Sequence, residues 1–250
     1  MPLRLDGTVL RSDRFPAPHA FTTRLGGVSE GVYASLNVGY RKGDPAANVE
    51  RNRALAARAA GAPGAVAALS QKVRDGVVVL GEGDEGDALV TDRPGAAVMT
   101  YSADCNLILL ADPAAGVVAS VHASRPGARG RIAFKTVGVM RSLGARRISA
   151  VVGPSIGPCC YDIYGPVLED WRGFGPEFLS ERGGKSRLDL KAANAAQLAE
   201  AGVEDVDVCD LCTFCRADWF YSSRRDGDET GRFGGIVWVG EAPGAGGAVR

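Results

Sequence analysis

The sequence predicts an α+β fold in which helices and strands are interspersed around mixed β-sheets. Hydrophobic residues make up 46% of the 250 residues and charged residues 23%, which is typical of a globular protein with a sizeable core. Segments 107–111 and 117–121 are apolar on both faces, so we expect them to be central strands covered on both sides. The elements do not alternate in a regular βαβ rhythm. We expect one domain over residues 1–250.

Local signals place the other elements along the chain. Strands are expected at residues 19–24, 77–80, 97–101, 148–152 and 235–239, and near Val206. Asp44 and Pro45 predict the start of a helix, as N-cap and first-turn residue, and Gly61 predicts its end. Further helices are expected at about 130–143 and 190–201. The glycine- and charge-rich segment 173–185 is the weakest point for a domain boundary.

Charge and composition exclude several classes of partner. The net charge is zero and the pI is about 6.7, so the sequence offers no basic excess for a nucleic-acid partner. No apolar run approaches the length of a transmembrane helix or a signal peptide. Six cysteines without a signal peptide indicate free thiols in a reducing compartment. We therefore expect a cytoplasmic monomer that acts on a small molecule and contacts no membrane.

A predicted hairpin brings Cys105 close to His122. Residues 112–116 read as a turn between two apolar strands, so paired positions should sum to about 228, and Cys105 and His122 sum to 227. Only two histidines, His19 and His122, occur in the chain, and Asp104 adjoins the cysteine. The pair suits two chemistries. It could supply zinc ligands if a third ligand is found, or it could be a thiol–imidazole dyad.

A second group of cysteines and several arginines are further candidates. Cys209, Cys212 and Cys215 follow a CxxCxxC pattern, and a zinc or iron–sulfur site could borrow from Cys159 and Cys160. Buried thiols that pack as small hydrophobic groups are the simpler interpretation. The glycine-rich loop after Arg24, the arginines 125, 129 and 131, and the pair 224–225 are candidate anion-binding elements.

Several short strings in fixed order make the sequence recognisable. They are TTRLGGVS (22–29), SLNVG (35–39), DALVT (87–91), SADC (102–105), GPSIGPCC (153–160), LCTFC (211–215), RRDG (224–227) and TGR (230–232). Together they resemble the YfiH-type family, also called laccase-domain or polyphenol oxidoreductase proteins and now regarded as purine nucleoside phosphorylases. The resemblance spans roughly residues 18–240.

The resemblance implies a four-layer α/β/β/α fold and a purine-nucleoside pocket beside a zinc site of one cysteine and two histidines. It also implies phosphorolysis of adenosine, inosine and methylthioadenosine, with adenosine deamination as a further activity. Cys105 and His122 match two zinc ligands, whereas the third family histidine falls on Val73, or on Arg74 with a one-residue slip. The sequence therefore leaves both zinc binding and an impaired metal site open. The family string HAGWRG is also altered here, to HASRPG at 122–127.

The predicted catalytic residues are Cys105, His122 and Asp104. Arg24 and Arg225 are expected to contact phosphate or ribose, and Asn37 and Thr230 are further candidates for substrate binding. True multicopper laccase chemistry is excluded, because a blue-copper site and its partner cluster need more imidazoles than two histidines provide. Two alternatives stay open: a metal-free Cys–His hydrolase, such as an amidase acting on peptidoglycan precursors, and a non-catalytic relative that binds a nucleoside or a partner.

Overall fold

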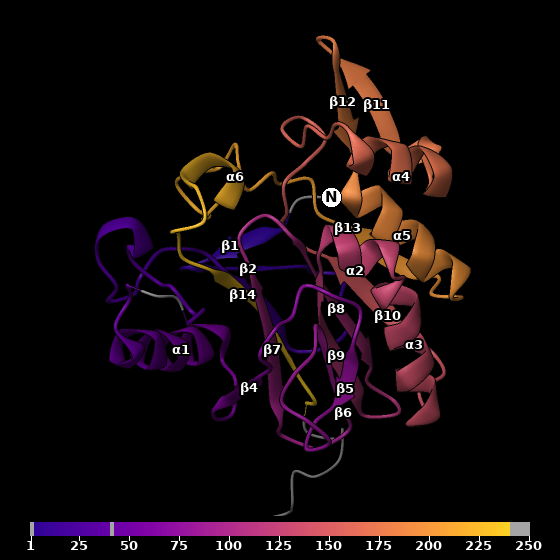
Figure 1. The fold of residues 1–250 in the computed structure, drawn as a ribbon. Helices are drawn as coiled ribbons and strands as arrows, with labels where there is room; N and C mark the ends of the chain where they lie inside the picture. Colours follow the sequence, from indigo (N-terminus) through magenta and orange to yellow (C-terminus); the bar gives the residue numbers. More distant parts are fainter. Residues whose placement is uncertain (1–2, 41–42, 241–250) are drawn as a thin grey trace, which may run out of the picture.

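Two six-stranded sheets lie face to face in the computed structural model, which describes residues 3–40 and 43–240 (Figure 1). The first sheet runs, in spatial order, β1 (Arg4–Asp6), β2 (Val9–Arg11), β3 (His19–Thr22), β14 (Phe233–Trp238), β7 (Ala97–Ser102) and β4 (Val66–Ala68). The second runs β13 (Asp205–Val208), β10 (Ser149–Val152), β8 (Asn106–Asp112), β9 (Val117–Ala123), β6 (Ala88–Thr91) and β5 (Val77–Val79). Each sheet contains parallel and antiparallel pairs, which confirms the prediction of mixed sheets.

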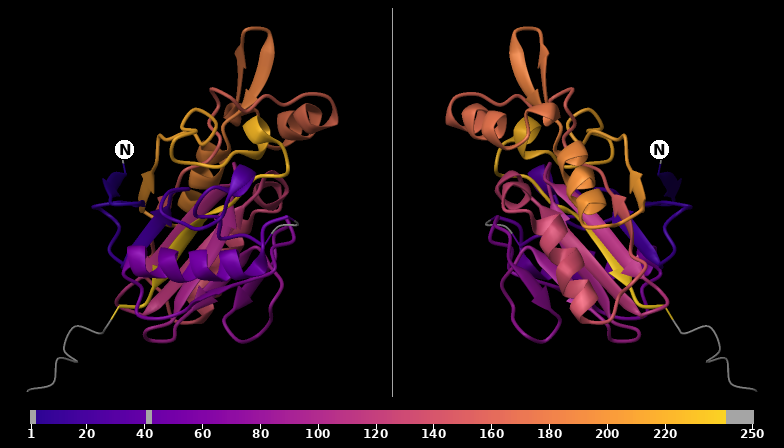
Figure 2. Two further views of the ribbon diagram at one scale, coloured as in Figure 1. Left: turned by 90° about the vertical axis from the view of Figure 1, so that its left-hand side faces the viewer. Right: turned by 90° about the vertical axis from the view of Figure 1, so that its right-hand side faces the viewer.

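Helices cover the outer face of each sheet and complete four layers. Helix α1 (Ala46–Ala60) packs on the first sheet, while α3 (Ile132–Ser142) and α5 (Leu190–Glu200) pack on the second (Figure 2). The short α2 (Arg125–Arg129) lies between β9 and α3 in the sequence. Apolar side chains such as Phe21 and Leu109 fill the space between the two sheets. The predicted α/β/β/α arrangement is therefore confirmed.

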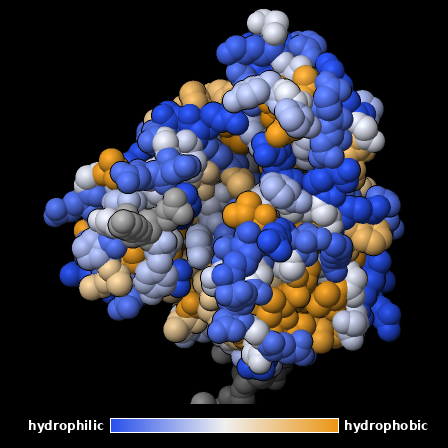
Figure 3. All heavy atoms as spheres, in the orientation of Figure 1, coloured by the Kyte–Doolittle hydropathy of each residue, from blue (hydrophilic) through white to orange (hydrophobic). Residues whose placement is uncertain are grey.

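The remaining elements lie outside the two six-stranded sheets. They are η1 (Gly31–Tyr33), α4 (Pro166–Phe174), η2 (Pro176–Phe178), the hairpin of β11 (Leu179–Arg182) and β12 (Lys185–Leu188), and α6 (Ser223–Asp226). The hairpin projects beyond the sheets and carries mainly hydrophilic side chains (Figure 3). Trp171, Leu188 and Leu190 pack together beneath the hairpin, and Leu190 is the first residue of α5. This packing connects the hairpin and α4 to α5. The expectation of a single domain stays a prediction.

Strands β8 and β9 are the central pair of the second sheet. All seven residues of each strand are buried, because the first sheet covers one face and α3 and α5 cover the other. This confirms the expectation drawn from their doubly apolar pattern. No helix in the described part of the chain combines the length and hydrophobicity needed to cross a membrane.

Helix α1 ends as its sequence predicts but begins differently. Gly61 adopts the left-handed conformation with φ of 76°, and its N–H closes the last turn. Pro45, not Asp44, is the N-cap, and no side chain caps the helix. The Asp44 carboxylate instead accepts hydrogen bonds from Ser29 Oγ (2.8 Å) and Asn37 Nδ2 (2.6 Å), which are buried polar groups that need an acceptor.

Asp112 closes the β8–β9 turn and fixes the chain that leads into β10. Its carboxylate accepts N–H groups from Ala114 (3.1 Å) and Ala115 (3.2 Å), and from Arg146 (2.6 Å) and Arg147 (2.8 Å). Burial by itself would raise the pKa of Asp112, but these hydrogen bonds outweigh it and lower the pKa below its usual value of 3.8. The ionised carboxylate therefore stabilises the native state.

Asp112→Asn is expected to lower the free energy of unfolding by about 2 kcal/mol at pH 7, because charge-assisted hydrogen bonds are lost. Since the folded pKa lies below the unfolded one, this stabilisation is complete above about pH 4 and fades as the pH falls through the folded value. Urea unfolding of both proteins at pH 7, 5 and 3 measures it. If the difference in free energy of unfolding between the two proteins stays constant down to pH 3, the explanation is wrong.

Candidate active site

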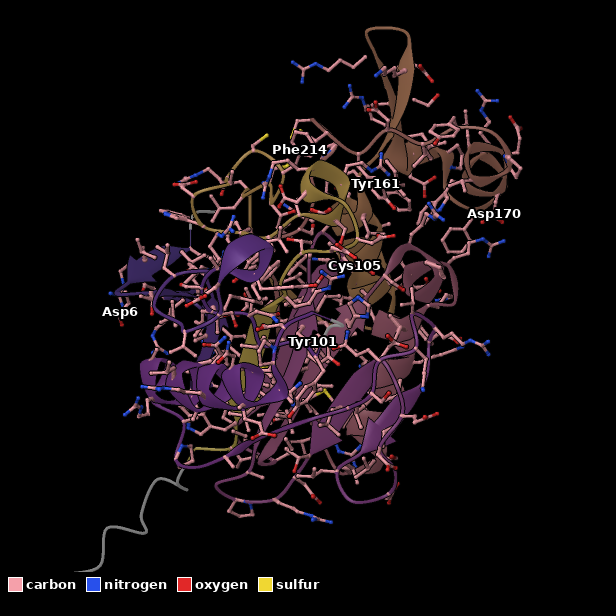
Figure 4. The ribbon with its side chains drawn as sticks, turned by 60° about the vertical axis from the view of Figure 1, so that its left-hand side comes forward. Asp6, Tyr101, Cys105, Tyr161, Asp170 and Phe214 are labelled. Carbon is pink, nitrogen blue, oxygen red and sulfur yellow. The ribbon has the colours of Figure 1, made fainter. Side chains whose placement is uncertain are left out.

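A cavity of about 860 Å³ opens where the ends of β7, β8 and β9 meet the loops at the top of the sheets. Cys105 and His122 line it, together with three tyrosines and three arginines: Tyr40, Tyr101, Tyr161, Arg53, Arg224 and Arg232. Tyr101, Cys105 and Tyr161 follow one another upward through this region in Figure 4. The volume lies within the range of roughly 300–1,000 Å³ that is usual for small-molecule sites.

The structure brings Cys105 and His122 together, but not as directly opposed residues. The register pairs Leu107 with His122, so paired positions sum to 229 instead of the expected 228. Cys105 precedes the first residue of β8 and lies on the diagonal from His122. The turn closes at Asp112 and Val117, which shifts the pairing by one residue. Because diagonal neighbours of equal parity share a face of the sheet, the two side chains still lie together at the cavity.

Asp87 fixes the orientation of His122. Its Oδ1 lies 2.8 Å from Nδ1 of the histidine, and the backbone N–H of His122 donates to the Asp87 carbonyl at 2.7 Å. Nδ1 is thereby engaged, and Nε2 is the ring nitrogen that remains for chemistry. Burial by itself would lower the pKa of His122, but the charge of Cys105 and the hydrogen bonds to Asp87 and Cys105 raise it to about 9. At neutral pH the site therefore holds an imidazolium between two acidic groups.

The same carboxylate also holds the loop that carries Val73. Asp87 accepts the backbone N–H groups of Lys72 (3.2 Å), Val73 (3.0 Å) and Arg74 (2.9 Å). These bonds, with the one to His122, keep the pKa of Asp87 below its usual value despite its burial. Val73 adopts φ of 59°, and its side chain, at the cavity wall, is half exposed.

The residues present do not complete a three-ligand zinc site at this pair. Zinc bound for catalysis takes three protein ligands, and only Cys105 and His122 offer ligand atoms here. Val73 has no donor atom, and Asp87 is occupied by His122 Nδ1 and three backbone amides. No third histidine, cysteine or carboxylate among the described residues joins the pair in a metal-binding group. The chemistry of this centre is therefore derived from the side chains alone.

Asp104 lines the cavity as a buried acceptor. Its carboxylate receives hydrogen bonds from Thr213 Oγ1 (2.6 Å), Ser222 Oγ (2.9 Å) and the N–H of Arg224 (2.7 Å). It joins the β7–β8 loop to two distant segments, and its φ of 97° is rare outside glycine. All these bonds hold structure in place, so a catalytic role for Asp104 stays a prediction.

The four residues expected to bind substrate do not line the cavity. Arg24 donates twice to the carbonyl of Ala34, and Arg225 donates to the carbonyls of Thr213, Phe214 and Phe220. Asn37 is fully buried and orders the backbone at Gly39 and Arg232, and Thr230 is buried as well. Their contacts with phosphate or ribose stay predictions.

Other residues supply the polar and aromatic walls that the sequence did not single out. Arg53 stacks over Tyr40 at 4.6 Å and over Tyr101 at 5.5 Å. Gln71 pairs its amide with both backbone groups of Tyr101, at 2.8 Å each, which holds that strand end at the cavity. Residues 71 and 101 are 30 positions apart, and no short-range pattern links them. Asp87 was not singled out either. The one sequence signal that could have indicated it is its position directly before an apolar strand.

His19 lies in β3 and does not line the cavity. Its Nε2 accepts the N–H of Ser12 at 3.0 Å, and its Nδ1 lies 2.8 Å from the carbonyl of Ala17. Burial is the main cause that lowers its pKa. With both ring nitrogens engaged, it is not available as a ligand for Cys105 and His122, so a multicopper centre cannot be assembled there.

Comparison with known proteins places this chain in a family. A family model described as multi-copper polyphenol oxidoreductase laccase matches residues 18–240. The chain is 43% identical, over 97% of each chain, to a purine nucleoside phosphorylase of Deinococcus radiodurans. It is 33% identical to the purine nucleoside phosphorylase YlmD of Geobacillus stearothermophilus, over 84% of this chain and 86% of the relative.

Two solved structures share the fold. Bacillus licheniformis YfiH superposes with a TM-score of 0.87 at 30% identity, covering 95% of this chain and 99% of the other. Geobacillus stearothermophilus YlmD superposes with a TM-score of 0.86 at 32% identity, covering 96% and 99%. The chain therefore belongs to the YfiH-type family, whose model carries the laccase description.

Proposed function

We propose that the protein is a purine nucleoside phosphorylase that acts on a nucleoside and inorganic phosphate in the cytoplasm. Similarity to relatives that bear this name supports the proposal. The structural observation that carries it is the cavity, in which aromatic and cationic walls meet at Cys105 and His122. The expectation of a monomer without a nucleic-acid partner stays a prediction.

The cavity suits both halves of such a substrate pair. Tyr101 and Tyr161 offer aromatic surface for a flat purine, since stacking on aromatic rings favours any base. Arg53, Arg224 and Arg232 bring guanidinium groups to the same space, and guanidinium is the side chain best matched to a phosphate. Both reactants can therefore lie together beside His122.

His122 would act as the proton donor in this reaction. Phosphate oxygen attacks C1′ of the ribose as the C1′–N9 bond breaks, and the bonding electrons pass to the purine. A proton from imidazolium Nε2 to N7 of the purine neutralises the charge that develops there. Asp87 holds the ring and Cys105 stabilises its protonated form. The products are the free base and ribose 1-phosphate, with His122 left neutral until it is reprotonated by solvent.

Purified protein incubated with inosine and phosphate tests the proposal. Hypoxanthine should be released only when phosphate is present, with ribose 1-phosphate formed in equal amount. Adenosine and methylthioadenosine assayed in parallel define the base specificity, and conversion of adenosine to inosine reports deamination. Nucleoside binding without turnover, unaffected by Cys105→Ala, would contradict the proposal and indicate a non-catalytic relative.

One observation favours a second candidate function. Asp87 contacts Nδ1 of His122, and Cys105 lines the same cavity as His122, so thiol, imidazole and carboxylate gather here as they do in a cysteine hydrolase. Under this alternative the protein would be a metal-free amidase acting on peptidoglycan precursors. Amide hydrolysis that is lost in Cys105→Ser and is indifferent to phosphate would favour it over phosphorolysis.

The Cys105 thiol is expected to react quickly with iodoacetamide near neutral pH. His122→Asn should slow this alkylation about tenfold at pH 7, because the neutral amide cannot stabilise a thiolate as imidazolium does. Peptide mapping by mass spectrometry separates Cys105 from the other cysteines. Cys209 is buried at 1% exposure and serves as the slow internal reference. Equal rates at Cys105 in both proteins would show that the pair is not an ion pair.

A further inference from the structure

Four cysteine thiols from two distant segments meet above the cavity. Cys159 and Cys160 lie in the turn that follows β10, and Cys212 and Cys215 lie in the loop that follows β13. Their sulfur atoms all lie within 4.8 Å of one another, so the group could hold a metal ion. Phe214 lies in one segment and Tyr161 in the other, and both are labelled at the upper end of the molecule in Figure 4.

The sulfur spacing agrees with one tetrahedral metal ion. Cys215 Sγ lies 3.4 Å from the sulfur of Cys160 and 3.8 Å from that of Cys159. With a zinc–sulfur distance of about 2.3 Å, tetrahedral geometry requires sulfur atoms about 3.8 Å apart. A centre with several irons would need its thiolates further apart. Four soft sulfur donors select zinc over harder cations such as Mg²⁺ or Ca²⁺.

The backbone around the cluster is arranged to receive thiolate charge. The N–H of Gly157 donates to Cys212 Sγ at 3.3 Å. Thr213 N–H donates to the carbonyl of Ser155 at 3.1 Å, which joins the two segments beside the cysteines. Hydrogen bonds of this kind orient metal ligands and offset their negative charge.

Two arginines place positive charge next to the same segments. Arg187 donates to the carbonyl of Cys159 at 2.6 Å, and Arg225 donates to the carbonyls of Thr213 (3.0 Å) and Phe214 (2.9 Å). Each guanidinium group is also paired with a carboxylate, Arg187 with Asp162 and Arg225 with Asp226, so their role here is to hold the carbonyls of the two cluster segments. Arg225, expected from the sequence to bind substrate, has its guanidinium group on the cluster loop.

We propose that Cys159, Cys160, Cys212 and Cys215 form a structural Zn²⁺ site. Four protein ligands leave no open coordination position, which is the mark of a structural centre and not a catalytic one. Cys209, which the sequence grouped with this set, lies outside it as a buried thiol that accepts the N–H of Leu211. The site is separate from Cys105 and His122.

The zinc would hold the upper rim of the cavity. Ile156 and Tyr161 line the cavity and flank one pair of cysteines, and Thr213, between the other pair, donates to Asp104. Without the metal, the two segments are joined by a few hydrogen bonds and by the packing of Ile156 and Tyr161 with Cys212. With zinc bound, the two segments would be cross-linked and would form one rigid rim of the cavity.

Metal analysis of the purified protein and four variants tests the site. We expect about one zinc per chain in the wild type. Cys212→Ser and Cys215→Ser should lose at least nine-tenths of it, whereas Cys209→Ser and Cys105→Ser should keep it. Cys209→Ser is the matched control, because it removes a cysteine from the same loop. Zinc that is lost in Cys105→Ser and kept in Cys215→Ser would overturn the proposal, as would iron in place of zinc.

A second measurement uses the wild type alone, so it does not depend on whether the variants fold. Removal of zinc by a chelator should expose about three more thiols to a disulfide reagent, because Cys159, Cys160 and Cys215 are accessible and Cys212 is buried. It should also lower the thermal midpoint by roughly 5 °C or more, and added Zn²⁺ should restore both. An unchanged thiol count, or a disulfide between Cys160 and Cys215 in place of metal, would overturn the assignment.

Discussion

His122→Asn is expected to lower kcat/KM for inosine phosphorolysis by about a hundredfold or more. General acid catalysis by a positioned imidazole typically contributes a factor of about 10² to 10⁴. Asparagine keeps a similar length and can still hydrogen bond to Asp87, but it cannot carry a proton to the departing purine. The loss should fall on kcat more than on KM, since the cavity walls that bind the base and the phosphate are unchanged.

The same substitution at the other histidine provides the control. His19 lies outside the cavity, and its imidazole only joins backbone groups of β3 and its neighbours. His19→Asn should therefore reduce stability and leave kcat/KM within about threefold of the wild type. Steady-state assays at saturating phosphate measure both variants. If the two variants retain similar activity, His122 is not the proton donor.

Asp104→Ala should be among the most destabilising substitutions in the chain, with a loss of about 3–5 kcal/mol in the free energy of unfolding. It leaves two buried hydroxyls, those of Thr213 and Ser222, and the N–H of Arg224 without their acceptor. Each such group costs about 1–3 kcal/mol when it is buried unsatisfied. The alanine must also keep a φ of 97°, where a Cβ is strained.

Thermal and urea unfolding measure this effect, with an exposed aspartate as reference. Asp13 forms a surface ion pair with Arg4, so Asp13→Ala should change stability by less than about 1 kcal/mol. Asp104→Asn should fall between the two, because asparagine retains one acceptor oxygen and tolerates positive φ. If Asp104→Ala unfolds at the same temperature and urea concentration as Asp13→Ala, the segments that Asp104 joins are held together by other contacts.

Short-range patterns predict the centre of the fold and the position of the site. The apolar runs of β8 and β9 and the glycine that ends α1 act locally, so their sequence is sufficient evidence. The predicted register of the β8–β9 hairpin was wrong by one residue. The length of the turn sets the register, and the composition of the turn does not reveal that length. The error still placed Cys105 and His122 on the same face.

The rest depends on contacts between distant residues. Asp87 meets His122 because β6 pairs with β9, and Gln71 meets Tyr101 across 30 positions. The four-cysteine cluster joins two segments that are more than 50 residues apart, so spacing suggested the wrong third partner, Cys209. The short strands β1, β2, β4, β6, β11 and β12 were not expected, whereas the equally short β5 was, because it is a continuous run of valines.

The backbone conformation at Val73 is unusual for the side chain that it carries. The loop is held by three backbone amides on Asp87, so its shape does not depend on which side chain stands there. Its φ of 59° is unfavourable for a β-branched residue, whereas histidine is one of the side chains enriched in that region. The backbone thus fits the histidine that the family resemblance places there better than the valine it carries. A histidine at position 73 would therefore meet a loop whose shape is already held by Asp87.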